Sequence, residues 1–298
     1  MPALRRILIM LMALPPMILC VPGPVVAAAP IEVFVSILPQ RYLVQQIGAE
    51  RVNAQALVEP GADPHTYEPK PGQMADLTKA RLYFSIGMPF EKVWLPKISA
   101  ANPLLKVVAT DQGIAKLPMA DHGDDHGHAH ASDHAEASLD PHIWLAPQLL
   151  KTMAQTISMA LSEAAPEDAA RFAENYRQFA ERMDDLDGQI RALLAGKQGM
   201  RFIAFHPSWG YFAKAYGLVQ IPIEIEGKEP KAAQLRDLIR KARELKITVV
   251  FAQPQFSTRS AELIAEEIGG RVIPADPLAA DVPANLLRQA QAFQGALR

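Results

Sequence analysis

Short apolar runs alternate with helix-like stretches in the first third of the chain. Residues 31–37, 52–58 and 82–86 are rich in β-branched and aromatic side chains, and they predict three strands, with a short fourth at 107–109. The stretches 40–47 and 74–80 between them predict helices. Strands that alternate with helices in this way favour an α/β fold with a parallel sheet.

The same alternation returns in the last third of the chain. Residues 202–205, 219–225, 248–252 and 271–274 predict strands, and residues 211–216, 231–245 and 260–268 predict helices. The helix at 231–245 has one apolar side, formed by Leu235, Ile239, Ala242 and Leu245. Two separate α/β lobes are therefore expected, in keeping with a chain longer than one average domain.

Two helices are predicted between the lobes, at about 148–162 and 166–195. The second begins with Pro166, Glu167 and Asp168, which suit a first helical turn. Its apolar positions follow a 4-3 spacing that indicates one buried face: Phe172, Tyr176, Phe179, Met183, Leu186, Ile190 and Leu193. A free coiled coil is the alternative, but the stripe is short and α/β patterns flank it. We expect a rigid spine helix that joins an amino-terminal lobe (30–147) to a carboxy-terminal lobe (198–298) through connecting helices at 148–197.

The amino terminus has the order of a secretory signal. Arg5 and Arg6 precede an apolar stretch at 7–19, and small residues follow at 27–29. The apolar part is too short to span a bilayer, so residues 1–29 are expected to be cleaved on export. Cys20 could anchor a lipoprotein, but the large Leu19 before it disfavours this.

Composition restricts the chemistry of the exported chain. Cys20 is the one cysteine, so the mature chain would have no disulfide and no thiolate ligand, and a transition-metal site must use His and carboxylate groups. The net charge is −2 and no basic stripe is present, which argues against a nucleic-acid partner. A monomer is expected.

A polar tract separates the predicted fourth strand from the connecting helices. Between 113 and 138 the composition shifts to His, Asp, Gly and Ala, which predicts a mobile loop. Five of the eight histidines lie here: His122, His126, His128, His130 and His134. Neutral imidazoles at this density bind Zn²⁺ weakly and reversibly, so the loop is expected to gather or sense metal as an accessory to a main site. A merely solvated loop is the alternative.

The other three histidines are candidate metal ligands. His65 and His206 each follow a predicted strand, as does Asp276, and His142 follows the polar tract. Ligands of open α/β sheets bind beyond the carboxyl ends of the strands, so these four side chains are expected to meet between the lobes around one divalent metal. Taken singly, each histidine could be an ordinary loop residue and Asp276 a helix cap. Trp144 and Trp209 are expected to pack around the site.

Four motifs resemble those of a known family: 63–69 (DPHTYEP), 140–145 (DPHIWL), 205–212 (FHPSWGYF) and 226–230 (EGKEP). Their order and sequence are similar to the zinc/manganese substrate-binding proteins of ABC uptake systems, the ZnuA/TroA-like or cluster A-I solute receptors. The resemblance implies a periplasmic receptor that captures Zn²⁺ between two lobes and delivers it to a membrane permease. His65, His142 and His206 fall on the family's histidine ligands, Asp276 falls on a carboxylate that many members use as the fourth, and the His-rich loop is typical of zinc-specific members.

Several alternatives remain open at this stage. Asp63, Glu68 or a water could replace Asp276 as the fourth ligand. The metal could be Mn²⁺ or Fe²⁺ in a receptor of the same family, and a periplasmic zinc buffer without a permease is a further candidate. A zinc hydrolase is the alternative from another class, although the sequence has no His-Glu-x-x-His motif.

Overall fold

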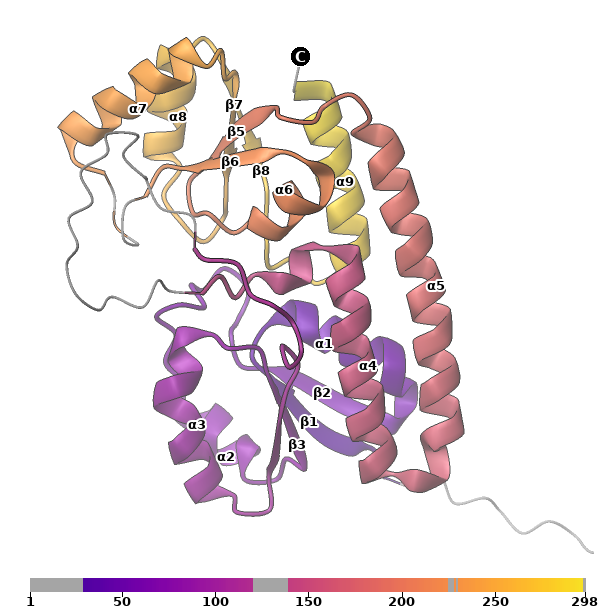
Figure 1. The fold of residues 1–298 in the computed structure, drawn as a ribbon. Coiled ribbons are helices and arrows are strands. Elements are labelled where there is room, and N and C mark those ends of the chain that lie inside the picture. Colours follow the sequence, from indigo (N-terminus) through magenta and orange to yellow (C-terminus); the bar gives the residue numbers. More distant parts are fainter. Residues whose placement is uncertain (1–28, 120–138, 225–227, 229, 297–298) are drawn as a thin grey trace, which may run out of the picture.

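The computed structural model describes residues 29–119, 139–224, 228 and 230–296. Most of the predicted signal segment and all five histidines of the polar tract lie outside these residues. Two α/β lobes are stacked end to end, and one long helix runs along both (Figure 1). Within the described ranges, no helix is both long and apolar enough to cross a membrane.

The amino-terminal lobe is built on a four-stranded parallel sheet of order β2-β1-β3-β4. Its strands are β1 (Ile31–Val35), β2 (Val52–Ala56), β3 (Leu82–Ser85) and β4 (Lys106–Ala109). Its helices are α1 (Leu38–Gly48), α2 (Pro71–Leu77) and α3 (Pro89–Ala101). All four side chains of β3 are buried, as expected for a central strand with helices on both faces.

The carboxy-terminal lobe repeats this plan with a parallel sheet of order β6-β5-β7-β8. Its strands are β5 (Arg201–Ala204), β6 (Val219–Pro222), β7 (Val249–Ala252) and β8 (Arg271–Pro274). Its helices are α6 (Gly210–Tyr216), α7 (Ala232–Glu244), α8 (Arg259–Glu267) and α9 (Val282–Ala296). The eight predicted strands of the two lobes are thus confirmed, each within a few residues.

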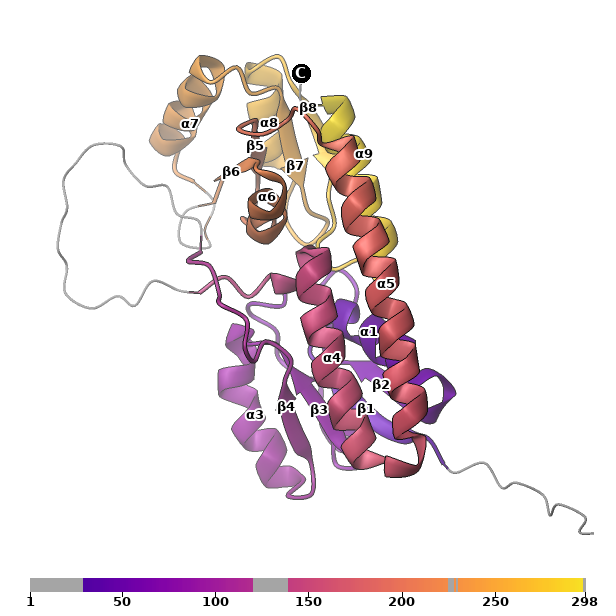
Figure 2. The same ribbon diagram turned by 45° about the vertical axis from the view of Figure 1, so that its right-hand side comes forward.

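The predicted connecting helices are α4 (Pro147–Ala164) and α5 (Ala169–Leu193), with a 3₁₀ turn at Pro166–Asp168 between them. At about 1.5 Å per residue, the 25 residues of α5 span roughly 38 Å. The predicted stripe is buried at Phe172, Phe179, Met183, Leu186 and Ile190. This face packs on α1 and α4 in one lobe and on α9 in the other, so α5 is the predicted spine (Figure 2).

One hydrophobic core extends through both lobes. It runs from the amino-terminal sheet through Trp144 and Phe179 to Phe212 and Phe293 of the second lobe. A smaller core lies on the other face of the second sheet, where α7 and α8 cover it. Because the larger core is continuous, the lobes hold a defined arrangement and the segments between them are fixed in space.

Candidate metal centre

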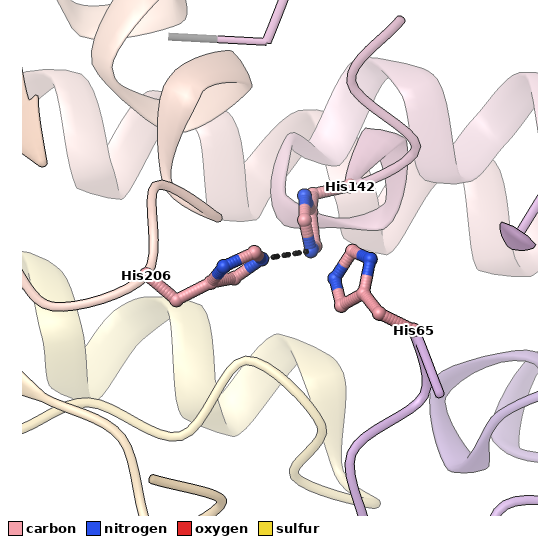
Figure 3. A group of neighbouring side chains, drawn as sticks. All are labelled: His65, His142 and His206. Carbon is pink, nitrogen blue, oxygen red and sulfur yellow. Dashed lines mark hydrogen bonds between the residues drawn. The ribbon is translucent and has the colours of Figure 1, made fainter. Parts of the chain in front are cut away.

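His65 lies on a fixed loop between β2 and α2. Three prolines, Pro60, Pro64 and Pro69, restrict the backbone of this loop. The carboxylate of Asp63 accepts hydrogen bonds from the backbone N–H of His65 at 2.9 Å and from the hydroxyl of Thr66 at 3.0 Å. These contacts aim the His65 ring into the space between the lobes, where Figure 3 shows it beside the other two histidines.

His142 is almost fully buried at the start of the 3₁₀ turn Ile143–Leu145, which precedes α4. Oδ1 of Asp140 accepts the backbone N–H of His142 at 2.8 Å and also lies 2.7 Å from its ring Nδ1. A hydrogen atom on Nδ1 is therefore donated to Asp140. The lone pair of the neutral ring is then on Nε2.

His206 follows β5 by two residues and is fixed in the same manner. Its backbone N–H donates to Oε1 of Gln253 at 2.9 Å, and its Nδ1 lies 2.7 Å from Oε1 of Glu224. Glu224 follows β6, the strand that pairs with β5 in parallel. The two strands thus deliver the imidazole and its carboxylate partner at the same edge of the sheet.

The three rings converge (Figure 3). Nε2 of His142 lies 3.3 Å from Nε2 of His206, and one nitrogen from each ring lies within 4.8 Å of the others. Tetrahedral zinc binds imidazole nitrogen at about 2.0–2.1 Å, which places two such nitrogens roughly 3.3–3.4 Å apart. The separation of the two Nε2 atoms therefore matches one edge of a zinc coordination tetrahedron.

Burial lowers the pKa of two of the three imidazoles, those of His65 and His142. Burial and the neighbouring His142 and His206 lower the pKa of His65 to about 2, and burial lowers the pKa of His142 well below its ordinary value. Burial also raises the pKa of Asp140 to about 7. Nε2 of His65 is buried and has no hydrogen-bond partner in the described part of the chain. Imidazole nitrogens that converge at this distance, with one of them buried and unbonded, fit the inner ligands of a metal site.

The pocket around the rings is mostly apolar. Besides the histidines it is lined by Pro64, Trp144, Gln255, Phe256, Pro277 and Leu278. Trp144 packs on His142 and donates its indole N–H to the carbonyl of Pro277 at 2.7 Å. Trp209 instead packs against Phe212 and Phe293, and it is not among the pocket residues. Of the two predicted packing residues, Trp144 thus contacts the site directly.

The structure does not bring Asp276 into the group of ligand atoms formed by the three histidines, among the residues it describes. Oδ1 of Asp276 accepts hydrogen bonds from Gln255 Nε2 at 2.7 Å and from the backbone N–H of Leu278 at 2.9 Å. Asp63 caps the His65 loop, and Glu68 is exposed. The fourth ligand therefore stays a prediction, as does the role of the five histidines at 122–134, which lie outside the described residues.

Sequence reasoning missed Asp140 and Glu224 as partners of the ligands. Asp140 stands two residues before His142, so an Asp-x-His spacing could have suggested it. Glu224 is 18 residues from His206 and becomes its neighbour through the pairing of β5 with β6. The only signal in the sequence was an acidic residue at the end of an apolar strand.

Comparison with known proteins agrees with this geometry. The family model for the periplasmic zinc-uptake complex component A, ZnuA, matches residues 33–294. The high-affinity zinc uptake system protein ZnuA of Bacillus subtilis is 29% identical over 245 residues, which cover 81% of this chain and 76% of that protein. Its counterpart from Brucella abortus is 29% identical over 283 residues, which cover 84% of each chain.

Solved structures similar to this chain also include ZnuA proteins. A crystal structure of ZnuA aligns with a TM-score of 0.81 and 42% identity, over 90% of this chain and 99% of the other. A ZnuA deletion mutant with zinc bound aligns with the same score and identity, over 98% of its length. Since the family model covers nearly all of the described fold, the chain belongs to the ZnuA family of periplasmic zinc-uptake components.

Proposed function

We propose that the chain captures Zn²⁺ between its lobes through His65, His142 and His206 and hands the ion to an ABC-type permease for uptake. The metal assignment rests on the 3.3 Å separation of the Nε2 atoms of His142 and His206. In both rings the other nitrogen, Nδ1, contacts a carboxylate. Three imidazole nitrogen donors suit Zn²⁺ better than Mn²⁺, which favours oxygen ligands.

The outer carboxylates support transport more than catalysis. A zinc hydrolase requires a general base close to the metal-bound water. Asp140 and Glu224 instead contact the Nδ1 side of their imidazoles, opposite the Nε2 atoms that face the pocket. Membership of a family of uptake components agrees with a binding protein and not an enzyme.

Alanine substitution tests the ligand set. His65→Ala, His142→Ala and His206→Ala should each weaken Zn²⁺ binding by orders of magnitude, because each removes one of the inner ligands. Competition with a chelator of known affinity measures the dissociation constant. His126→Ala is the matched control, since it removes a histidine from the polar tract and should retain the tight site. An unchanged constant for one of the three variants would exclude that residue from the coordination shell.

Asp276 remains the proposed fourth ligand. It could reach the ion directly after a shift of its side chain, or act through Gln255, which lines the pocket and donates to it. Asp276→Asn keeps the size and removes the charge, so a direct ligand should lose Zn²⁺ affinity strongly. Wild-type affinity in Asp276→Asn would leave Asp63, Glu68 or water as the fourth ligand.

The proposal also includes export by a cleavable signal and delivery of the ion to a membrane permease. The family description names a periplasmic component of an uptake complex, which supports both. Growth in zinc-poor medium should require the chain and a membrane permease together; rescue without a permease would favour a zinc buffer. Amino-terminal sequencing of the exported protein should find a start near residue 30.

A further inference from the structure

Residues 117–118, in the described first part of the polar tract, meet residues 139–140, which follow the tract, directly beside the metal site. Pro118 and Leu139 form an antiparallel bridge, and the backbone N–H of Asp140 donates to the carbonyl of Leu117 at 2.8 Å. His142 follows two residues later. The backbone that carries this ligand therefore leaves the narrow junction of 117–118 with 139–140, which we call the neck.

A tyrosine from the other lobe is inserted into this neck. The hydroxyl of Tyr211 accepts the backbone N–H of Leu117 at 3.0 Å and donates to the carbonyl of Asp140 at 2.8 Å, so it contacts both strands of the neck. Tyr211 is the second residue of α6, and this helix lies on the side of the second lobe that faces the first (Figures 1 and 2). Its side chain is buried, and burial raises its pKa to about 12, so the hydroxyl keeps the proton it donates.

The close approach of α6 to Asp140 is a second, independent contact. A Cβ atom on Gly210 would lie 2.9 Å from Oδ2 of Asp140. The other oxygen of that carboxylate holds both the backbone and the ring of His142. Only a residue without a side chain fits between α6 and an Asp140 that is already fixed on the ligand.

We propose that Tyr211 is a positioning residue for the metal site, a role that rests on the proposed function of His142 and His206 as zinc ligands. Its hydroxyl holds the backbone that carries His142 against the lobe that carries His206. Tyr211 and His206 are five residues apart. One short stretch of the second lobe thus supplies the ligand His206 and also the hydrogen bond that positions the backbone next to His142. This contact slows release of the ion by resisting separation of the two imidazoles.

Tyr211→Phe in the full mature chain tests the role, because it keeps the ring and removes both hydrogen bonds. Zn²⁺ release into an excess of chelator, followed by stopped flow, should become about tenfold faster, as expected for the loss of one to two ordinary hydrogen bonds. Bound Co²⁺ should show an altered visible spectrum, because the geometry of its ligands is less restrained.

Tyr216→Phe is the matched control. It lies on the same helix and loses a buried hydrogen bond from its hydroxyl to Oδ1 of Asp187 at 2.9 Å, away from the neck. It should lower the melting temperature of the metal-free protein and leave Zn²⁺ release and the Co²⁺ spectrum unchanged. Release from Tyr211→Phe at the wild-type rate, or changes equal to those of Tyr216→Phe, would overturn the proposal.

Gly210→Ala tests the second contact, that of α6 with the carboxylate of Asp140, and it is the alternative variant if Tyr211→Phe does not fold. The added methyl group should displace Asp140 and accelerate release, and an unchanged rate would count against the role of this contact. His142→Ala is measured in parallel. Tight binding in His142→Ala would refute the proposed ligand set, whereas loss of binding there with normal release from Tyr211→Phe would refute only the positioning role.

Discussion

Two of the three imidazoles at the candidate metal centre, those of His142 and His206, are each paired with a carboxylate. Asp140 and Glu224 each accept from Nδ1 of a histidine, which fixes the tautomer and increases the basicity of the nitrogen that faces the pocket. Carboxyl groups in these positions would also offset part of the charge of a divalent ion. Affinity for the ion is therefore expected to depend on residues that never touch it.

Removal of either carboxylate charge should weaken zinc binding. Asp140→Asn and Glu224→Gln preserve shape, and each should reduce Zn²⁺ affinity by about 10- to 100-fold because the imidazole loses its orienting acceptor. Chelator competition measures the change. Asp184→Asn is the control, since Asp184 pairs with Lys151 on the surface of the spine and should have no effect on binding. Affinities that match the control would show that the carboxylates serve packing alone.

A buried carboxylate away from the metal centre makes stability depend on pH. Glu91 is 4% exposed and accepts hydrogen bonds from the backbone N–H groups of Ile86 and Gly87 at 3.0 and 2.8 Å. Burial raises its pKa above the ordinary value of 4.5 in spite of these bonds. The folded state therefore binds this proton more tightly than the unfolded state. The resulting stabilisation is present below pH 4.5 and is lost as the pH rises through the folded pKa.

Urea unfolding of the wild type and of Glu91→Gln from pH 4 to pH 7 measures this effect. The free energy of unfolding of the wild type, relative to the variant, should fall as the pH increases. Subtracting the variant cancels the other titrating groups, which both proteins share. A difference that stays constant, or increases with pH, would contradict the raised pKa.

At the residue scale, the sequence was sufficient to predict that three histidines converge and insufficient to predict their environment. His65, His142 and His206 stand in Pro-rich motifs near predicted strand ends, and the structure brings them together. The bond between His206 and Glu224 depends on the register of β5 with β6, and the contact of Tyr211 with the neck depends on how the lobes stack. Neither register nor stacking can be read from local patterns.

The elements of secondary structure were predictable where the apolar pattern was regular. All strands and the spine helix agree with the sequence, whereas α3 and α9 were missed. Helix α3 begins at Pro89 and contains Pro96, a residue that usually ends a helix. Helix α9 places Leu286, Ala290 and Phe293 on its buried side, but the polar Asn285 and Gln289 are buried there too and interrupt the apolar pattern.

The spine helix contains a position that can be stabilised. Gly188 lies inside α5, and a Cβ atom there would meet nothing within 4 Å. Gly188→Ala should therefore raise the free energy of unfolding by about 0.5–1 kcal/mol, because alanine loses less conformational entropy than glycine in a helix. Urea denaturation measures the gain. Zinc affinity should not change, and a destabilised variant would show that a bend at Gly188 is required.

For the molecule as a whole, zinc and folding should be linked. An ion bound only by the folded chain stabilises it by mass action, by about 4 kcal/mol at a thousandfold excess over the dissociation constant. The melting temperature should rise on addition of Zn²⁺ and return to its initial value with a chelator. A variant that lacks residues 120–137 should keep this shift and bind less zinc in total. Loss of the shift would place the tight site in the polar tract.

The fourth coordination position and the polar tract show where whole-molecule reasoning from sequence ends. Asp276 follows β8 in sequence, as expected, but its carboxylate is engaged by Gln255 and the backbone of Leu278. Strand order could locate the end of the sheet at which Asp276 lies. It could not give the orientation of one side chain among competing donors.

The larger core passes without a break from one lobe to the other, and the ligands come from both. During synthesis His65 and His142 appear before His206, so the growing chain holds two of the three converging imidazoles before the third is made. Tight binding of one Zn²⁺ ion would therefore indicate that the carboxy-terminal lobe has docked on the amino-terminal lobe. Titration with Zn²⁺ would then measure the fraction of molecules in a preparation whose two lobes have docked correctly.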